Sequence, residues 1–241
     1  EVEFDPRGAR PGPVTARHEW KGGAVEARHD VILVDPRAPY MIVSDVDDTV
    51  IVTGLTDLLR AARLTFLRNA HTRRPLPGVG ELYRALAAGD DGNARSPIFY
   101  VSDSAWNLYD LLDEFIRLHD IPRGPLLLKG IGRRTRTRRH KDQTLHRLRR
   151  MWPDLPAVLI GDSGQHDAAV YARVVRAFPD RILAVYIRDV EPGAESPRAA
   201  RVDREIAAIE SLGVPFERSS DSLAMAEHAR SIGLICDDDA V

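Results

Sequence analysis

A single cysteine, Cys236, occurs in the 241-residue sequence, which excludes a disulfide framework and a cysteine-based zinc site within the chain. No apolar run approaches the roughly 20 residues of a membrane-spanning helix, and no signal-peptide pattern is present. The formal net charge of −2 predicts no bulk attraction to nucleic acid or to anionic lipid. From these absences we expect a cytoplasmic protein.

Lysine is also scarce, because arginine supplies all but three of the 34 basic residues. The lysines are Lys21, Lys129 and Lys141. The hydrophobic share of 44 % is ordinary for a globular protein. The length suits one α/β domain, alone or with a small appendage, and such a chain can bury a core without covalent staples.

The order of the predicted elements indicates an α/β fold. Residues 1–39 are rich in Pro, Gly and Arg, which is typical of the end of a β-rich module or an extended arm. From Tyr40 onward apolar strands alternate with helices, which implies a Rossmann-like parallel sheet with helices on both faces. Strands are predicted at 40–44, 98–101, 126–128, 157–160 and 182–187, and helices at 55–70, 78–88, 106–119, 141–151, 167–178, 201–212 and 222–232. Ligands of such folds bind outside the carboxyl ends of the strands, so the polar residues there are the site candidates.

Acidic residues directly follow the first predicted strand. Asp45, Asp47 and Asp48 place three carboxylates within four positions, where mutual repulsion and partial burial are both costly. A divalent cation offsets both costs, and hard oxygen ligands suit Mg²⁺. The alternative is an Asp-rich turn, since Asp favours turns and helix caps.

Two later strands end in further candidates. Ser102 follows the second strand, where its hydroxyl can bind a phosphate oxygen or cap the helix that starts near Trp106. Asp162 follows the strand at 157–160, where it can complete a metal site or cap the next helix. Neither residue decides between its two roles on its own.

A basic run extends from Arg133 to Lys141 and holds six formal cations and no acid. Lys141 is the best candidate in it for a phosphate ligand, because it opens a helix and adds to the positive end of the helix dipole. Lys129 is the alternative lysine. For most of the arginines a solvated loop is the simpler interpretation.

These signals stand in one order: Asp-x-Asp-x-Thr after the first strand, Ser after the second, then Lys, then Gly-Asp and a second Asp. This order resembles the four motifs of the haloacid dehalogenase superfamily. A response-regulator receiver domain is excluded, because its phospho-acceptor lies on a middle strand and its lysine follows the last. The resemblance implies a Mg²⁺-dependent phosphohydrolase with a haloacid dehalogenase-like fold.

The resemblance also implies a role for individual residues. Asp45 attacks phosphorus and forms an aspartyl-phosphate. Asp47 protonates the leaving oxygen and later activates water as a general base. Ser102 and Lys141 hold the phosphoryl oxygens, and Thr49 braces this phosphate-binding loop.

A metal site is implied as well. Mg²⁺ is expected on the Asp45 carboxylate, the Asp47 backbone carbonyl and Asp162, with Asp167 as a supporting or alternate metal residue. Within the superfamily, an acid at position 47 favours phosphatase chemistry over dehalogenase or P-type ATPase chemistry.

Seven segments carry a narrower resemblance: 43–50 (VSDVDDTV), 68–71 (RNAH), 75–79 (PLPGV), 99–102 (FYVS), 106–109 (WNLY), 160–167 (IGDSGQHD) and 186–190 (YIRDV). In this order they resemble the catalytic domain of the actin-patch-associated phosphatidate phosphatases and their bacterial relatives. The resemblance implies Mg²⁺-dependent hydrolysis of phosphatidate to diacylglycerol, the reaction also attributed to lipins. Asp103 departs from the pattern, since a neutral residue is expected there.

The resemblance divides the chain into two parts. Residues 1–39 are interpreted as the remnant of a β-rich region that precedes this domain in relatives, and residues 40–241 as the phosphatase domain. Only about 55 residues separate Asp45 from Ser102, too few for a large cap domain. We therefore expect an open site, which suits a bulky or membrane-borne substrate.

The positions of the arginines indicate which partners the protein binds. Those in the predicted helix at 55–70 and in the basic run predict a peripheral contact with an anionic membrane. Nucleic-acid binding is disfavoured by the net charge and by the lack of aromatic residues within the basic run. Two alternative functions stay open: a phosphatase of a soluble phosphomonoester, and a lipid-binding module with a weak active site.

Overall fold

The computed structural model describes residues 12–20, 22–31, 33–51, 75–130, 139–190, 192–193 and 196–236. The predicted helix at 55–70 and the basic residues 133–138 lie outside the described residues, so the predictions made for them, and the expected lack of a large cap domain, stay predictions. The chain divides into two compact units, residues 1–36 and 37–241. The interpretation of residues 1–39 as a remnant region also stays a prediction.

The first unit contains one antiparallel hairpin. Strand β1 (Gly12–Trp20) pairs with β2 (Gly23–Val31) along its whole length. Gly22 lies in the turn with a φ of 132°, a value that a residue with a Cβ rarely adopts.

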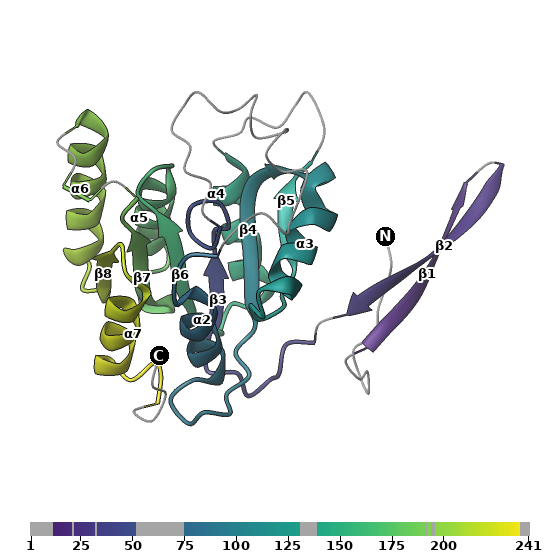
Figure 1. The fold of residues 1–241 in the computed structure, drawn as a ribbon, viewed down its shortest axis with the longest axis horizontal. Helices are drawn as coiled ribbons and strands as arrows, with labels where there is room; N and C mark the ends of the chain where they lie inside the picture. Colours follow the sequence, from purple (N-terminus) through teal and green to yellow (C-terminus); the bar gives the residue numbers. More distant parts are fainter. Residues whose placement is uncertain are drawn as a thin grey trace. The chain divides into compact units, whose positions relative to one another are not determined.

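The second unit is built on a six-stranded sheet with the order β5-β4-β3-β6-β7-β8. All neighbouring strands in it are parallel, as the alternating pattern predicts (Figure 1). The strands are β3 (Met41–Ser44), β4 (Ile98–Ala105), β5 (Leu126–Lys129), β6 (Ala157–Asp162), β7 (Ile182–Arg188) and β8 (Phe216–Ser219). The helices are α2 (Val79–Ala88), α3 (Tyr109–Leu118), α4 (His140–Met151), α5 (Asp167–Ala177), α6 (Pro197–Glu210) and α7 (Ser222–Ser231), with short 3₁₀ turns at Trp106–Leu108 and Pro179–Arg181.

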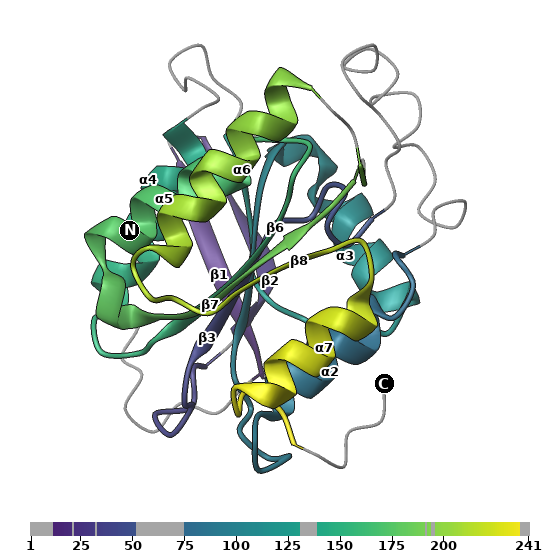
Figure 2. The ribbon, with the colours of Figure 1, turned by 90° about the vertical axis from the view of Figure 1, so that its left-hand side faces the viewer.

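Helices cover both faces of this sheet. Figure 2 shows α4, α5 and α6 grouped on one face, and α2 and α7 side by side on the other. The strand order reverses at β3, since β4 and β5 lie on one side of it and β6 to β8 on the other. The carboxyl ends of β3, β4 and β6 therefore outline the crevice where open α/β sheets bind ligands.

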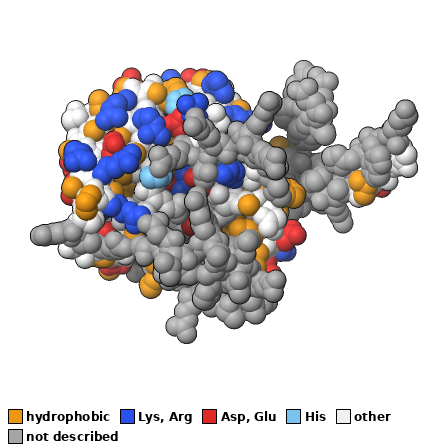
Figure 3. Space-filling model, turned by 90° about the horizontal axis from the view of Figure 1, so that it is seen from above, with side chains coloured by type: hydrophobic (Ala, Val, Ile, Leu, Met, Phe, Trp, Pro, Cys, Tyr) orange, Lys and Arg blue, Asp and Glu red, His pale blue; other side chains and the backbone are white. Residues whose placement is uncertain are grey.

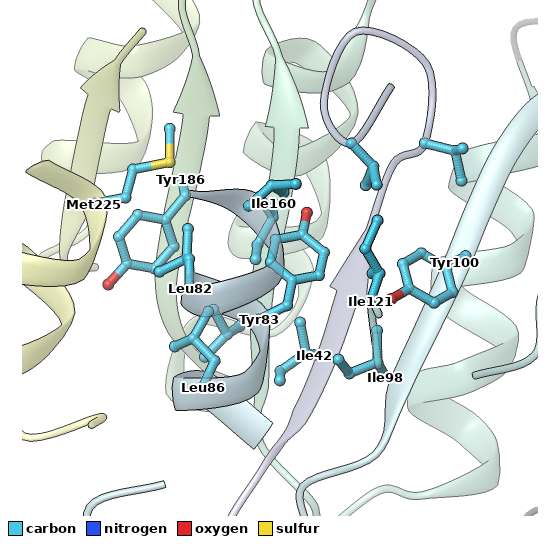
Figure 4. Packing of buried hydrophobic residues seen from close by; sticks show 14 of the residues in the cluster. Ile42, Leu82, Tyr83, Leu86, Ile98, Tyr100, Ile121, Ile160, Tyr186 and Met225 are labelled. Carbon is cyan, nitrogen blue, oxygen red and sulfur yellow. The ribbon is translucent and has the colours of Figure 1, made fainter. Parts of the chain in front are cut away.

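The core below this crevice is apolar and closely packed. Leu82, Tyr83 and Leu86 of α2 lie over the sheet, next to Ile42 of β3 and Ile160 of β6 (Figure 4). Each of these side chains is almost completely buried. Burying an aliphatic or aromatic side chain stabilises a fold by about 1.5–3 kcal/mol, so this cluster gives the crevice a rigid floor.

The structure corrects several predicted element boundaries and adds one strand. Strand β6 continues to Asp162 instead of ending at Ile160, so Asp162 is the last residue of the strand. Strand β4 continues to Ala105 instead of ending at Val101, so Ser102 lies within the strand and not after it. Strand β8 was not predicted, because its segment FERS alternates only weakly. Helix α6 begins at Pro197 instead of Arg201, with the Ser196 side chain accepting a hydrogen bond from the amide of Ala199.

None of the described helices combines the length and apolar content needed to cross a bilayer.

Candidate active site

The carboxyl ends of three strands and the first turns of two helices bring the predicted site residues together. Strand β3 leads into Asp45 and Asp47, β4 carries Ser102, and β6 ends at Asp162. Helices α4 and α5 supply Lys141 and Asp167 from their first turns. All six side chains are buried.

Lys141 is the lysine that reaches the predicted nucleophile. Its Nζ lies 2.8 Å from Oδ1 of Asp45 and 2.5 Å from Oδ1 of Asp167. Lys129, the alternative, lies half-buried at the end of β5. The structure therefore places Lys141, and not Lys129, in contact with Asp45.

Thr49 lies beside the same carboxylate. Its Oγ1 donates to Oδ2 of Asp45 at 3.4 Å, and the backbone N–H of Asp45 donates to the carbonyl of Ile160 on β6 at 2.8 Å. Asp48 takes a φ of 58° in the loop between them, a left-handed conformation that Asp tolerates better than most residues. The third acid of the sequence cluster thus helps to shape the loop.

Asp162 and Asp167 are bonded differently. Oδ1 of Asp162 accepts from the backbone N–H of Gln165 at 2.7 Å, whereas its buried Oδ2 has no hydrogen-bond partner in the described structure. Oδ2 of Asp167 accepts from the backbone N–H of Asp162 at 3.2 Å, and its Oδ1 contacts Lys141. The N-cap of α5 is His166 without a side-chain bond, so Asp162 does not cap that helix.

This carboxylate group fits a divalent cation. Oxygen atoms of Asp45, Asp162 and Asp167 all lie within 4.8 Å of one another. These three carboxylates offer only hard oxygen ligands. The buried Oδ2 of Asp162 has no hydrogen-bond partner in the described structure, so a cation could bind it. Asp162 is the clearest direct ligand, because both oxygens of Asp45 and both oxygens of Asp167 already contact other groups.

Gln165 also belongs to this site and was not predicted. Its side-chain Nε2 donates to the backbone carbonyl of Asp47 at 3.3 Å, the atom that the sequence resemblance assigns to the metal. Gln165 lies in the segment Gly-Asp-Ser-Gly-Gln that follows the predicted strand at 157–160, and this position at a strand end could have marked it as a site residue. Its side chain links the β6 loop to the β3 loop.

The Asp47 carboxylate is held by two hydroxyl groups. Its Oδ2 accepts from Oγ of Ser102 at 2.9 Å and from Oγ of Ser104 at 2.8 Å. The turn after β4 starts with Ala105 as N-cap and has no side-chain cap, so Ser102 does not cap the helix. Ser104 is a site residue that sequence reasoning missed; its i+2 spacing from Ser102 was the signal.

Burial and neighbouring charges raise the pKa values of two acids of the site, Asp45 and Asp162. Burial raises the pKa of Asp45 to about 8, and repulsion from Asp167 and Asp47 adds to the rise while Lys141 opposes it. Burial also raises the pKa of Asp162 well above its usual range, with Asp167 and Asp45 adding to it. These carboxylates are poorly compensated, which is the condition that a bound cation relieves.

The pKa of Lys141 is raised, which favours its charged form. Burial alone would lower the pKa of Lys141, but the carboxylates of Asp167, Asp45 and Asp162 outweigh burial and raise that pKa well above its usual range. The side chain is therefore a fixed ammonium group at neutral pH.

Asp103, the departure from the family pattern, lies at the edge of the site. Burial raises the pKa of Asp103, while the charges of Lys141 and His140 act against that rise. Its Oδ1 is buried without a hydrogen-bond partner in the described structure.

A second set of hydrogen bonds supports the backbone of Asp45, the predicted nucleophile. The hydroxyl of Ser44 donates to the backbone carbonyl of Asp45 at 2.6 Å, and the hydroxyl of Tyr83 lies 2.6 Å from Oγ of Ser44. Because the Ser44 proton is used on Asp45, Tyr83 is the donor to Ser44. This chain connects the core helix α2 to the backbone of Asp45.

A parallel sheet with buried carboxylates and a lysine at its carboxyl edge is typical of metal-assisted enzymes that transfer phosphoryl groups. Residues 40–189 match the family described as the catalytic domain of phosphatidate phosphatase APP1, and the chain belongs to this phosphatase family.

Two fungal proteins are similar to the chain. The phosphatidate phosphatase APP1 of Saccharomyces cerevisiae is 32 % identical over 160 residues, which cover 63 % of this chain. An uncharacterized protein of Schizosaccharomyces pombe is 30 % identical over 174 residues, or 69 % of this chain. The matched regions are 26 % and 28 % of those proteins, so the chain spans about a quarter of the length of these relatives.

Proposed function

We propose that this protein is a Mg²⁺-dependent phosphatidate phosphatase of the haloacid dehalogenase superfamily. It hydrolyses phosphatidate to diacylglycerol and phosphate through an aspartyl-phosphate on Asp45. The observation that carries the proposal is the contact between Lys141 and Asp45 at the end of β3, within a chain that matches a phosphatase catalytic domain. The name of the yeast relative supplies the substrate.

In the first step a carboxylate oxygen of Asp45 forms a bond to phosphorus. The bond between phosphorus and the diacylglycerol oxygen breaks, and Asp47 in its protonated form gives its proton to that oxygen. In the second step Asp47, now ionised, takes a proton from water as the water oxygen bonds to phosphorus. The bond to Asp45 then breaks, which releases phosphate and restores the carboxylate.

The metal has a defined place in this scheme. Asp45, Asp162 and the backbone carbonyl of Asp47 are the groups that would hold Mg²⁺. When bound, the ion supplies Lewis-acid stabilisation and reduces the repulsion between the anionic substrate and the carboxylates. Asp167 contributes by holding Lys141.

Phosphate binding falls to Lys141, Ser102 and Thr49. The buried ammonium of Lys141 is already next to the attacking carboxylate, so it can neutralise phosphoryl oxygens without moving into the site. The Ser102 hydroxyl donates to Asp47 in this structure, so it must turn to reach a phosphoryl oxygen.

A lipid substrate and a peripheral membrane contact are supported by the surface around the site. Trp106, 58 % exposed, directly follows β4, and its ring stacks on that of Tyr109 with centroids 5.8 Å apart. Exposed tryptophan favours the interface between water and lipid. Figure 3, seen from above, shows groups of Lys and Arg side chains on the described surface, which favour anionic lipid.

The test is phosphate release in the presence of Mg²⁺. Phosphatidate in mixed micelles is compared with p-nitrophenyl phosphate and glycerol 3-phosphate, for the wild-type protein and for Asp45→Asn. We expect release from phosphatidate that the substitution abolishes. Release from soluble esters alone would replace the lipid substrate by a soluble phosphomonoester. No release from any substrate by folded, Mg²⁺-loaded protein would overturn the enzymatic proposal and favour a lipid-binding module.

A further inference from the structure

Ser104 is placed on the Asp47 carboxylate by an irregularity of β4. In the pairing of β4 with β5, Ser102 lies opposite Leu128 and Ala105 lies opposite Lys129, so two extra residues of β4 are inserted between these pairs. A bulge of this kind re-aims side chains at the end of a strand. Here it brings two serines, two positions apart, onto one carboxylate oxygen.

Hydrogen bonds join Ser102 and Ser104 to each other and to Asp47. The backbone N–H of Ser104 donates to Oγ of Ser102 at 2.9 Å, and both hydroxyls donate to Oδ2 of Asp47. All three side chains are buried, and Ser104 is only 3 % exposed. Buried hydrogen bonds to a carboxylate are among the stronger ones in proteins, so they fix its orientation.

Each serine hydroxyl has one proton to donate. When Ser102 turns its proton to a phosphoryl oxygen, Asp47 loses the hydrogen bond from Ser102. Ser104 then remains as the serine that holds Oδ2.

We propose that Ser104 is a positioning residue for the general acid Asp47. It holds Oδ2 while Ser102 binds the phosphate, and it thereby keeps the Asp47 carboxyl group in a fixed orientation. This inference rests on the proposed function, because it assigns a role within that reaction.

The inference has a specific kinetic signature. Protonation of the leaving oxygen is needed for an alkyl phosphate such as glycerol 3-phosphate or phosphatidate. It is hardly needed for p-nitrophenyl phosphate, whose leaving group is stable as an anion. The ratio of the two kcat/KM values therefore reports on the acid step, since kcat/KM covers the reaction up to the first irreversible step.

The experiment measures both kcat/KM values for wild type, Ser104→Ala and Ser104→Thr with Mg²⁺. For Ser104→Ala we expect a loss of about 100-fold on the alkyl phosphate, the low end of a general acid's contribution, and little change on p-nitrophenyl phosphate. Ser104→Thr keeps a hydroxyl and should regain most of the alkyl activity. If Ser104→Ala does not fold by thermal melting, Ser104→Cys, of nearly equal volume, replaces it.

A double-mutant cycle with Asp47→Asn tests the coupling on phosphatidate itself. If Ser104 acts through Asp47, Ser104→Ala causes no further loss of phosphatidate turnover in the Asp47→Asn background. Equal losses on alkyl and aryl phosphates, or fully additive losses in the cycle, would overturn the positioning role while leaving the proposed function intact. A wild-type protein inactive on every substrate would overturn both.

Discussion

The ammonium group of Lys141 lies 2.8 Å from Oδ1 of Asp45, and both side chains are buried almost completely. The same ammonium contacts Asp167 at 2.5 Å. A lysine in this position neutralises two acids that would otherwise repel each other, and it lies next to Asp45, the proposed nucleophile. The cation therefore contributes to stability as well as to the proposed chemistry.

Lys141→Met is expected to destabilise the protein by about 3–5 kcal/mol, because it leaves buried carboxylates without their cation. Urea unfolding in EDTA measures this loss. Adding Asp167→Asn should recover part of it, since one of the two acids is then neutral. Lys129→Met is the comparison variant and should lower stability less than Lys141→Met, because Lys129 is only half-buried. If Lys141→Met is as stable as the wild type, Lys141 is not the cation that compensates the buried carboxylates of Asp45 and Asp167.

Mg²⁺ binding is expected to release protons at pH 7. Burial raises the pKa of Asp45 to about 8, so a large share of this carboxyl is protonated at pH 7 and must ionise when the cation binds. Calorimetry in buffers of different ionisation enthalpy measures the release, which should shrink toward pH 9. Asp162→Asn should weaken Mg²⁺ binding. Binding that is tight and unchanged in Asp162→Asn would remove Asp162 from the metal site.

Tyr83→Phe is expected to cost about 1 kcal/mol of stability, the net value of a buried hydrogen bond. It should also lower turnover, because Tyr83 supports the Asp45 backbone through Ser44. Tyr186→Phe is the matched control, since its hydroxyl contacts His228 at 3.2 Å and none of the site residues. Equal effects of the two substitutions on turnover would argue against a supporting role for Tyr83.

Gly161→Ala is expected to lower both stability and turnover. A Cβ at this position would lie 2.7 Å from Cβ of Asp167 and 2.8 Å from the ring of Tyr171, so the partner of Lys141 must shift. Overpacking of this kind costs about 1–3 kcal/mol. Gly130→Ala, where a Cβ meets no atom within 4 Å, is the control and should be nearly neutral. Unchanged turnover in Gly161→Ala would show that Asp167 tolerates displacement.

The parallel sheet could be predicted because apolar strands and amphipathic helices repeat with local periodicity. The end of β4 could not, since the segment Ser102 to Ser104 is polar and resembles a loop. Its burial depends on a bond to Asp47, 57 residues away from Ser104 in the chain. Polar residues held by distant partners leave no periodic signal.

The acids and Lys141 of the site could be predicted from their positions at strand ends and helix starts. Which lysine contacts Asp45 could not be predicted, because both Lys141 and Lys129 stand at the boundary of an element. Gln165 was missed for a similar reason, since its partner Asp47 lies 118 residues earlier. Sequence thus indicates which side chains face the crevice more readily than which of them bond to one another.

The most direct measurement is chemical trapping of the phosphorylated protein. Asp47→Asn, which should slow hydrolysis of the intermediate, is mixed with Mg²⁺ and p-nitrophenyl phosphate radiolabelled in its phosphate, whose leaving group needs no proton from Asp47, and is then quenched in acid and mapped by mass spectrometry. We predict one phosphorylated residue, Asp45, and no label in Asp45→Asn. Phosphate attached to another residue, or single-turnover release by wild type without any protein-bound phosphate, would contradict Asp45 as the nucleophile.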